Sequence, residues 1–303
     1  MKVFPLLVSW ILMLGAGSIL YGQTTPFVQK TFEGTSLITS QTVEQPPSNG
    51  FEFNLQHRFG RVDLNDEPLH KFFGLDLVSN IRFGFIFPVF EWWSLGAGRT
   101  KYGKNYDIDT KFTVFRQTKD WKTPVSLSLY LNTAIMTDDF PIIQDNSYFD
   151  DGTTPFEYKF RHRVSYNAQV IVASKVSRWF SVQLSPTFVH RNLVEPEEEN
   201  ETYALPLGAR FKISFMSSII VEYSPVMQEP GEIKVNPLAG PAICPFALGF
   251  EVRPVGHVFQ IILSNSDRIL GQNLYTMEPV SPWDGYFFLG FNLHRNLYYK
   301  KRK

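Results

Sequence analysis

Three histidine–arginine pairs are the first residues whose spacing suggests shared chemistry. They are His57-Arg58, His162-Arg163 and His190-Arg191, and each lies near the end of a segment with alternating polarity. Because neighbouring residues of a strand face opposite sides, each arginine faces away from its histidine. One interpretation is a cationic constriction built from Arg58, Arg163 and Arg191. The alternative is three independent arginines inside a barrel, with the histidines at a membrane interface.

Signals for catalysis and for metal binding are weak in this sequence. It contains no GxSxG, HExxH, phosphate-loop or dinucleotide-binding motif. Ser185 and His190 resemble a nucleophile and its base, but their spacing places them on opposite faces of a strand. The single Cys244 excludes a disulfide framework and a thiolate cluster. We therefore expect no enzymatic activity, no cofactor and no metal site.

Two acidic clusters are a second candidate for binding. The first contains Asp138, Asp139, Asp150 and Asp151, and the second contains Glu197, Glu198 and Glu199. Outside a cell such carboxylates can take divalent cations and bridge to lipopolysaccharide, although neither cluster has the ligand spacing of a calcium loop. The alternative is two solvated acidic loops. Across the chain 29 basic residues balance 29 acidic ones, which argues against binding of nucleic acid.

Alternation of apolar and polar residues runs through most of the chain and predicts the elements that hold these residues. From Phe51, the residues Phe51, Phe53 and Leu55 alternate with polar neighbours, and a period of two indicates a β-strand. We count about twelve such segments, and the last covers Phe287 to Leu293. No segment has a convincing amphipathic helical pattern.

Long and short connections alternate between these predicted strands. Tight turns near Pro88, Thr118, Ser174, Phe215 and Arg253 separate longer connections such as residues 135–158 and 265–284. Outer-membrane barrels have short periplasmic turns and long external loops, whereas a soluble Greek-key sandwich has no reason to alternate in this way. The sequence thus predicts an all-β protein, an antiparallel transmembrane β-barrel of about twelve strands.

The ends of the chain differ from the barrel segment. Residues 1–22 have one early lysine followed by an apolar run, as in an export signal, and they predict delivery to the bacterial outer membrane. We expect residues 23–49 to form a periplasmic N-terminal segment, residues 50–297 to form the barrel and residues 298–303 to form a basic tail. During assembly the barrel-assembly machinery is the expected partner.

The same alternation predicts which charges face the lumen. If the apolar residues face lipid, the opposite face carries the lumen candidates Arg58, Arg82, Lys111, Arg163, Arg191 and Arg210, together with acidic residues such as Glu52, Asp107, Glu222 and Glu251. Such a wall either lines a pore with a mild preference for anions or forms salt bridges that close it. The sequence does not choose between the two.

A set of short motifs resembles a known family. They are HRFG at His57, FFGLD at Phe72, NIRFG at Asn80, LGAGRT at Leu95, HRV at His162, SPTFVHRN at Ser185, EY at Glu222, and GHVFQ at Gly256 followed by NS at Asn265. In this order they resemble a family of membrane-bound β-barrel domains of unknown function from Bacteroidetes-type bacteria. The departure is EVRPVGH, which replaces a glycine-rich approach to His257. The resemblance implies a barrel in the outer membrane, and it supplies no assigned activity, substrate or binding residues.

Two functions remain open from the sequence. The first is a narrow channel or transport accessory for small solutes. The second is a closed structural or surface-interaction barrel whose acidic loops bind a partner or lipopolysaccharide. In both cases membrane lipid surrounds the wall, and nothing in the sequence fixes the oligomeric state.

Overall fold

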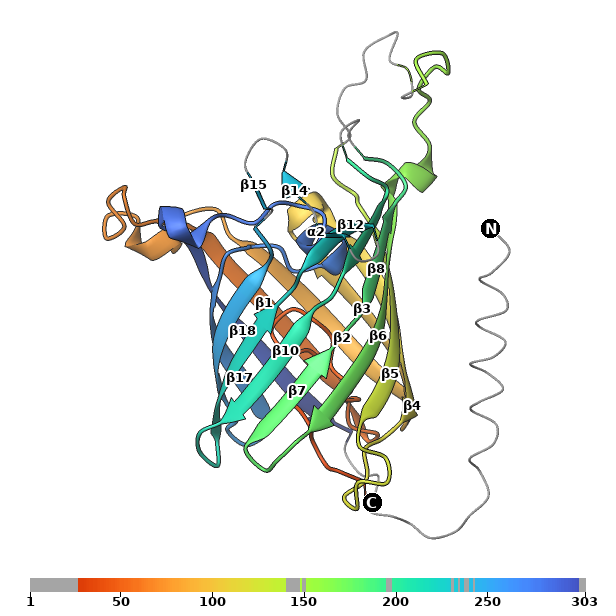
Figure 1. Ribbon diagram of the computed structural model, residues 1–303, viewed down its shortest axis with the longest axis vertical. Coiled ribbons are helices and arrows are strands. Elements are labelled where there is room, and N and C mark those ends of the chain that lie inside the picture. Colours follow the sequence, from red (N-terminus) through yellow and green to blue (C-terminus); the bar gives the residue numbers. More distant parts are fainter. Residues whose placement is uncertain are drawn as a thin grey trace.

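The protein is a closed antiparallel β-barrel (Figure 1). The computed structural model describes residues 27–139, 148, 151–194, 198–229, 232–233, 235–236, 240–241 and 243–299. Pairing runs from β6 (Val164–Lys175) through the intervening strands to β7 (Phe180–Leu184), and β7 also pairs directly with β6, so the sheet closes on itself. β1 (Gly50–Asp63) lies beside β18 (Tyr286–Tyr298) and joins the two ends of the barrel segment. The predicted barrel of twelve antiparallel strands is confirmed.

Eighteen strand segments make up the wall and a small accessory sheet. In chain order they are β1 (Gly50–Asp63), β2 (Asn80–Phe90), β3 (Trp93–Thr100), β4 (Tyr106–Phe115), β5 (Ser126–Ile135), β6 (Val164–Lys175), β7 (Phe180–Leu184), β8 (Thr187–Arg191), β9 (Glu201–Ala204), β10 (Leu207–Lys212), β11 (Ser217–Tyr223), β12 (Val226–Glu229), β13 (Glu232–Ile233), β14 (Val235–Asn236), β15 (Gly240–Pro241), β16 (Phe246–Val252), β17 (His257–Ser264) and β18 (Tyr286–Tyr298). β14 and β15 pair only with each other among the described strands.

Prolines divide several wall strands into two segments. Pro186 separates β7 from β8, Pro206 separates β9 from β10, and Pro225 separates β11 from β12. Proline has no N–H to give to the ladder, but its carbonyl still accepts a hydrogen bond. The residue before one proline therefore donates to the proline of the next strand, as Ser185 N–H does to the Pro206 carbonyl at 2.9 Å. Each split pair thus counts as one wall strand.

The outer face of the wall is apolar, as the alternation predicts. In β2, Phe83, Phe85 and Phe87 are about two-fifths exposed, whereas the preceding Arg82 and the intervening Ile86 are buried inside. Tryptophans 92, 121 and 179 are exposed at or near the short turns, and Trp283 is exposed among the long loops. An apolar outer band with aromatic residues at its edges is the surface that a membrane barrel presents to lipid.

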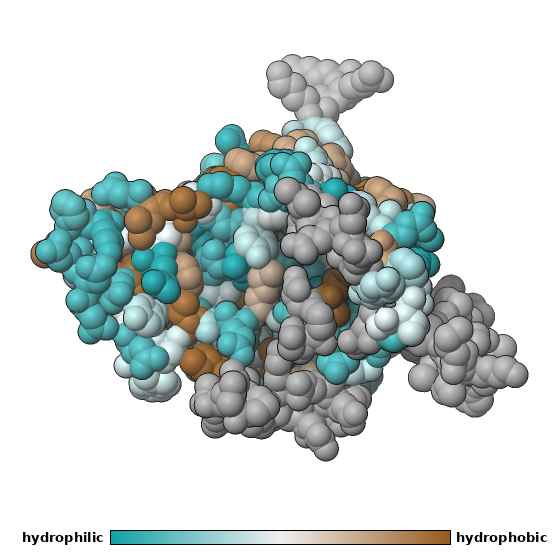
Figure 2. Space-filling model, turned by 90° about the horizontal axis from the view of Figure 1, so that it is seen from above, coloured by the Kyte–Doolittle hydropathy of each residue, from teal (hydrophilic) through white to brown (hydrophobic). Residues whose placement is uncertain are grey.

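Long and short connections lie at opposite ends of the barrel. The turns after β2, β6 and β10 are short, whereas the connections after β1, β5 and β17 are long and gather at the other end (Figure 1). Seen from that end, hydrophilic residues predominate among the described loops (Figure 2). Four short 3₁₀ segments and α2 (Gly271–Leu274) lie in connections. Among the described residues, no helix has the length and apolar character needed to cross a membrane.

Candidate functional site

The lumen of the barrel is occupied by the segment that precedes the first strand. Residues 31–45, called the N-terminal plug below, enter from the turn-bearing end, and Phe32, Leu37 and Ile38 are 0–1% exposed. The sequence analysis placed residues 23–49 in the periplasm, and this placement is wrong for the plug. The reason is that the serines and threonines of this segment form hydrogen bonds with residues of the lumen wall. The alternating pattern of the sequence gives no sign of these contacts.

A two-residue turn forms the tip of the N-terminal plug. Thr42 N–H donates to the Thr35 carbonyl, and Leu37 N–H donates to the Ser40 carbonyl, each at 2.9 Å. Beyond this short ladder, three successive N–H groups point at one wall carboxylate. Ile38, Thr39 and Ser40 donate to Glu222 of β11 at 2.8, 3.0 and 3.2 Å, and the Ser40 hydroxyl adds a fourth bond at 2.6 Å.

The other side of the same turn is held by neutral amides. The Ile38 carbonyl accepts the side-chain amide N–H groups of Gln56 at 3.1 Å and of Asn292 at 2.7 Å. Asn292 in turn accepts a hydrogen bond from the buried guanidinium of Arg58 at 2.9 Å. The N–H groups of the tip therefore face the carboxylate of Glu222, and its Ile38 carbonyl faces Asn292, which is bonded to the cationic Arg58. This arrangement matches the direction of the peptide dipole.

Two further wall groups hold the stem of the N-terminal plug. Lys111 of β4 donates to the carbonyls of Thr35 and Thr42 at 3.1 Å. Glu52 of β1 accepts the Thr35 hydroxyl at 2.6 Å and contacts the His294 ring nitrogen at 2.9 Å. All of these wall groups are buried, so their hydrogen bonds to the plug replace bonds to water.

Glycines on the wall leave room for the apolar tip. A Cβ on Gly208 of β10 would lie 2.6 Å from Leu37, and a Cβ on Gly249 of β16 would lie 3.4 Å from Ile38. Leu37 and Ile38 share one buried cluster with Ile220 of β11. A side chain at position 208 would press against Leu37, so Gly208 gives the tip of the plug room at this point of the wall.

A second segment enters the lumen from the loop-bearing end. The loop between β17 and β18 carries α2, and its Leu274 and Tyr275 pack against Val189, Ala204 and Val226 of the wall. Gln272 of α2 donates to the Asn132 side chain at 2.5 Å. This contact ties the loop to β5, because Asn132 is a wall residue.

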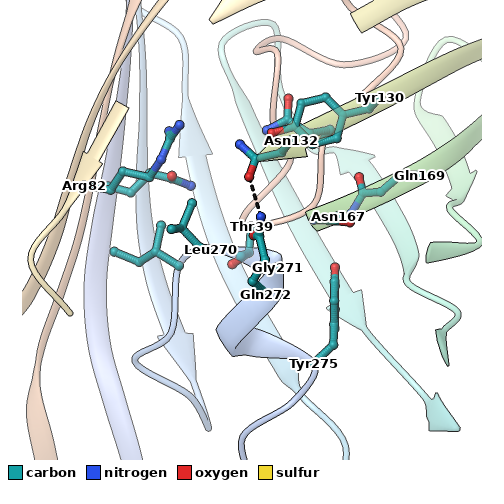
Figure 3. Close-up of a pocket in the computed structure, with 13 residues that line it drawn as sticks. Thr39, Arg82, Tyr130, Asn132, Asn167, Gln169, Leu270, Gly271, Gln272 and Tyr275 are labelled. Atoms are coloured by element: carbon teal, nitrogen blue, oxygen red, sulfur yellow. Dashed lines mark hydrogen bonds between the residues drawn. The ribbon is translucent and has the colours of Figure 1, made fainter. Parts of the chain in front are cut away.

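A small cavity separates the two inserted segments. It has a volume of about 20 Å³ and is lined by Thr39 and Gln41 of the N-terminal plug, by residues 269–272 and Tyr275 of the loop, and by Gln56, Arg82, Tyr130, Asn132, Asn167 and Gln169 of the wall. In Figure 3 the polar ends of Asn132, Asn167, Gln169 and Tyr275 approach this space from different elements. A space of this size holds about one water molecule, so the two inserted segments leave little free volume between them.

The predicted basic residues divide between the lumen and the loops. Arg82 pairs with Asp107 at 2.5 Å, and Arg210 pairs with Glu251 at 2.8 Å and with Glu33 at 2.9 Å. Together with Arg58 and Lys111, these residues are buried inside the barrel. Here each of these basic groups bonds a carboxylate, an amide or a backbone carbonyl.

Arg163 and Arg191 bond to loop residues, unlike Arg58. Arg163 donates to the carbonyls of Met136 and Asp138 at 3.1 and 2.6 Å. Arg191 pairs with Glu198 at 3.1 Å. Because these two arginines are engaged at the loop-bearing end while Arg58 bonds Asn292 in the lumen, the structure does not assemble the three into a shared constriction.

Among the predicted acidic residues that the structure describes, Asp138 and Asp151 form hydrogen bonds at the loop-bearing end. Lys104 pairs with Asp138 at 2.8 Å, and this hydrogen bond lowers the pKa of Asp138. Hydrogen bonds from the Thr154 hydroxyl and from nearby backbone N–H groups lower the pKa of Asp151 to about 2. Asp139 is exposed, as is Glu199. Asp150 and Glu197 lie outside the described residues.

The candidate catalytic pair does not meet. Ser185 is fully buried inside the barrel, whereas His190 is half-buried and its ring contacts Asn192 at 3.1 Å and Tyr166 on the outer face. Within the described parts of the chain, no group of three or more His, Cys, Asp or Glu is arranged to hold a metal ion.

The neutral amides of the lumen were not predicted from the sequence, although a signal for them is present. The buried asparagines and glutamines of the wall strands are Asn54, Gln56, Asn80, Asn132, Asn167, Gln169, Gln183, Gln260 and Asn292. Each occupies a polar position of an alternating segment, as the lumenal charges do. Charged residues alone are therefore an incomplete guide to the lining of the lumen.

Comparison with known proteins agrees with this architecture. Residues 32–297 match the family model described as a membrane bound beta barrel domain (DUF5777). Among solved structures, an outer membrane channel from Pseudomonas putida F1 superposes with a TM-score of 0.50 at 9% identity, and the match covers 84% of this chain and 98% of that one. This likeness concerns the fold alone.

Two other solved structures are more distant. The KdgM porin has a TM-score of 0.46 and 6% identity over 82% of this chain and 99% of its own. Outer membrane phospholipase A from Escherichia coli has a TM-score of 0.41 and 11% identity over 83% of this chain and 91% of its own. No curated protein matches the sequence. On the family match, which covers most of its length, the chain belongs to the family of membrane-bound β-barrel domains.

Proposed function

We propose that the protein is a bacterial outer-membrane channel for small solutes, held closed by its N-terminal plug. The observation that carries the proposal is the way the plug is bound. Its tip and stem contact the wall through hydrogen bonds to Glu222, Gln56, Asn292 and Lys111. Such bonds exchange with water at a net cost of about 1 kcal/mol for the neutral partners and about 1.5–3 kcal/mol for the charged ones, so the plug is removable without breaking the barrel.

The construction of the wall supports a pore rather than a filled barrel. Many wall residues that face the plug are polar, such as Glu222, Gln56 and Lys111, and Gly208 gives the plug space. A barrel that served only as a scaffold would gain more stability from apolar residues packed across the lumen. Twelve strands also enclose more space than the eight-stranded barrels whose side chains fill the interior.

The orientation of the channel follows from its loops. With the short turns in the periplasm, as in other outer-membrane barrels, the N-terminal plug enters from the periplasmic side and the loop that carries α2 enters from outside. Residues 27–30 then leave the barrel on the periplasmic side, where Phe27 bridges to Thr118 of a turn. A periplasmic event is thus the natural trigger for withdrawal of the plug.

Single-channel recording in planar lipid bilayers tests the proposal. Wild-type protein is expected to be closed for most of the recording, whereas a variant that lacks residues 27–46 should give stepwise currents. Folding of both proteins is checked by heat-dependent gel migration. If correctly folded protein without residues 27–46 passes no current, the channel is refuted and a closed structural or surface-interaction barrel is favoured.

A further inference from the structure

Three buried amide oxygens converge on the cavity between the two inserted segments. They are Asn167 Oδ1, Gln169 Oε1 and Gln272 Oε1, and none of them has a hydrogen-bond partner among the described residues. Asn167 and Gln169 lie two residues apart on β6 and so face the same side, while Gln272 comes from α2 (Figure 3). A buried acceptor without a donor is destabilising, so three at one place indicate a site for a molecule that supplies donors.

The charge around the cavity is already neutralised. Of the described residues that line it, Arg82 alone carries a formal charge, and its guanidinium is bonded to Asp107 by two nitrogens at 3.2 and 2.5 Å. Asn132 also donates to Asp107 at 3.2 Å. An anion entering the cavity would have to compete with Asp107 for Arg82, and a cation would meet the guanidinium. The lining therefore favours an uncharged ligand.

The lining also supplies donors and aromatic surface. Each amide that offers an oxygen also carries an NH₂ group, and Tyr130 and Tyr275 bring hydroxyl groups and rings to the same space. A hydroxyl group both donates and accepts, so a molecule with several hydroxyls on a carbon skeleton pairs with amide oxygens and amide N–H groups together. Thr39 and Gln41 of the N-terminal plug fill the adjoining volume in the closed state.

We propose that this amide-lined chamber binds an uncharged polyhydroxylated solute of the sugar or polyol class when the N-terminal plug withdraws. The proposal rests on the channel function proposed above, because the chamber reaches the size of a sugar only without Thr39 and Gln41. The hydroxyls donate to Asn167, Gln169 and Gln272, and the solute replaces the plug as the partner of the wall.

The test uses three probes with one carbon skeleton and different charge. Glucose, gluconate and glucosamine are titrated into the detergent-solubilised variant without residues 27–46, and binding is measured by calorimetry. The same probes are added to planar bilayers, where a bound solute interrupts the ion current. Glucose is expected to bind with saturation and to reduce the current, with gluconate and glucosamine binding about tenfold more weakly.

Matched variants locate the site. Asn167→Leu combined with Gln169→Met keeps side-chain volume but removes both oxygens, and it should weaken glucose binding about tenfold or more. Gln260→Met removes a buried wall amide that does not line the cavity and should leave glucose affinity unchanged. Equal loss in both variants would overturn the proposal.

Other outcomes separate this proposal from the channel function. Currents that no sugar reduces, together with no calorimetric binding, refute the sugar site but keep the channel. Binding of gluconate, glucosamine or calcium chloride in preference to glucose shows that the chamber takes an ion, and the proposal falls. If no current flows yet glucose binds and Asn167→Leu with Gln169→Met abolishes binding, the site stands and the channel does not.

Discussion

The carboxylate of Glu222 accepts the backbone N–H of Ile38 at 2.8 Å, although 184 residues separate the two in the sequence. The next two N–H groups of the same turn also donate to this carboxylate. A carboxylate held by successive backbone N–H groups resembles an anion in a backbone nest, with the protein supplying both partners. This bond connects the N-terminal plug to β11 of the wall.

Glu222→Gln is predicted to favour the open channel. Glutamine keeps one oxygen but loses the negative charge, and its NH₂ group faces backbone N–H donors that it cannot satisfy. Hydrogen bonds to a charged group contribute about 1.5–3 kcal/mol each, so the open probability should rise by about tenfold or more. Single-channel recordings of folded protein measure this directly.

The control is a second buried carboxylate that does not touch the plug. Asp107 bonds to Arg82 and Asn132, which both belong to the wall. Asp107→Asn should lower the temperature at which the barrel unfolds on gels without a comparable rise in open probability. A matching rise in both variants would mean that loss of any lumenal carboxylate loosens the barrel, and the specific role of Glu222 would be lost.

A reversible cross-link should hold the N-terminal plug in place. A Cβ built on Gly34 would lie 3.0 Å from Cγ of the His294 ring. Adding one C–C bond of about 1.5 Å places the two Cβ atoms at most about 4.5 Å apart, within the range of a disulfide. Gly34→Cys with His294→Cys, in a background of Cys244→Ser and Glu222→Gln, should be closed when oxidised and conducting after dithiothreitol.

The single-cysteine variants provide the comparison for this experiment. Gly34→Cys alone and His294→Cys alone, in the same background, should conduct with or without dithiothreitol. Mass spectrometry of a tryptic digest reports whether the disulfide has formed. Current through fully cross-linked protein would show that solutes pass beside a docked plug, which contradicts gating by this segment.

The strands of the barrel wall can be predicted from local sequence because every side chain that faces lipid must be apolar. Phe83, Phe85 and Phe87 alternate with lumen-facing residues over the length of β2, and the same alternation recurs in every long strand. Burial of backbone polar groups in lipid leaves a closed sheet as the only way for such strands to cross the membrane. Strand number, connection lengths and facing could therefore be predicted.

The contents of the lumen could not be predicted in the same way. Residues 31–45 contain serines, threonines and two adjacent apolar residues at the tip, a composition typical of a loop. Their position depends on Glu222, Lys111 and Asn292, which come from three distant strands. Likewise, Gln272 meets Asn132 across 140 residues. Such contacts are fixed by the closed barrel and leave no periodic pattern in the sequence.

Arg82 and Asp107 form a buried ion pair. Removal of either partner alone is predicted to destabilise the barrel strongly, because the other partner is then left buried without its counter-charge. Arg82→Met leaves Asp107 buried without its cation, which costs about 3–5 kcal/mol. The variant should convert to the unfolded gel form at a lower temperature. Asp107→Leu added to Arg82→Met should recover part of the loss, and an unchanged transition in the single variant would contradict the argument.

Arginine on the outer face should destabilise the barrel in proportion to its depth in the membrane. Phe85 lies in the middle of β2 and Val89 lies near its end, and both are exposed on the outer face. In outer-membrane barrels an arginine at the bilayer midplane costs about 2–4 kcal/mol, whereas near the interface it costs about 0–1 kcal/mol. Urea titrations of protein refolded into lipid vesicles should therefore show a much larger loss for Phe85→Arg than for Val89→Arg. Equal losses of unfolding free energy would mean that Phe85 and Val89 do not lie at different depths in hydrocarbon. That result would contradict the assignment of the apolar outer face to lipid.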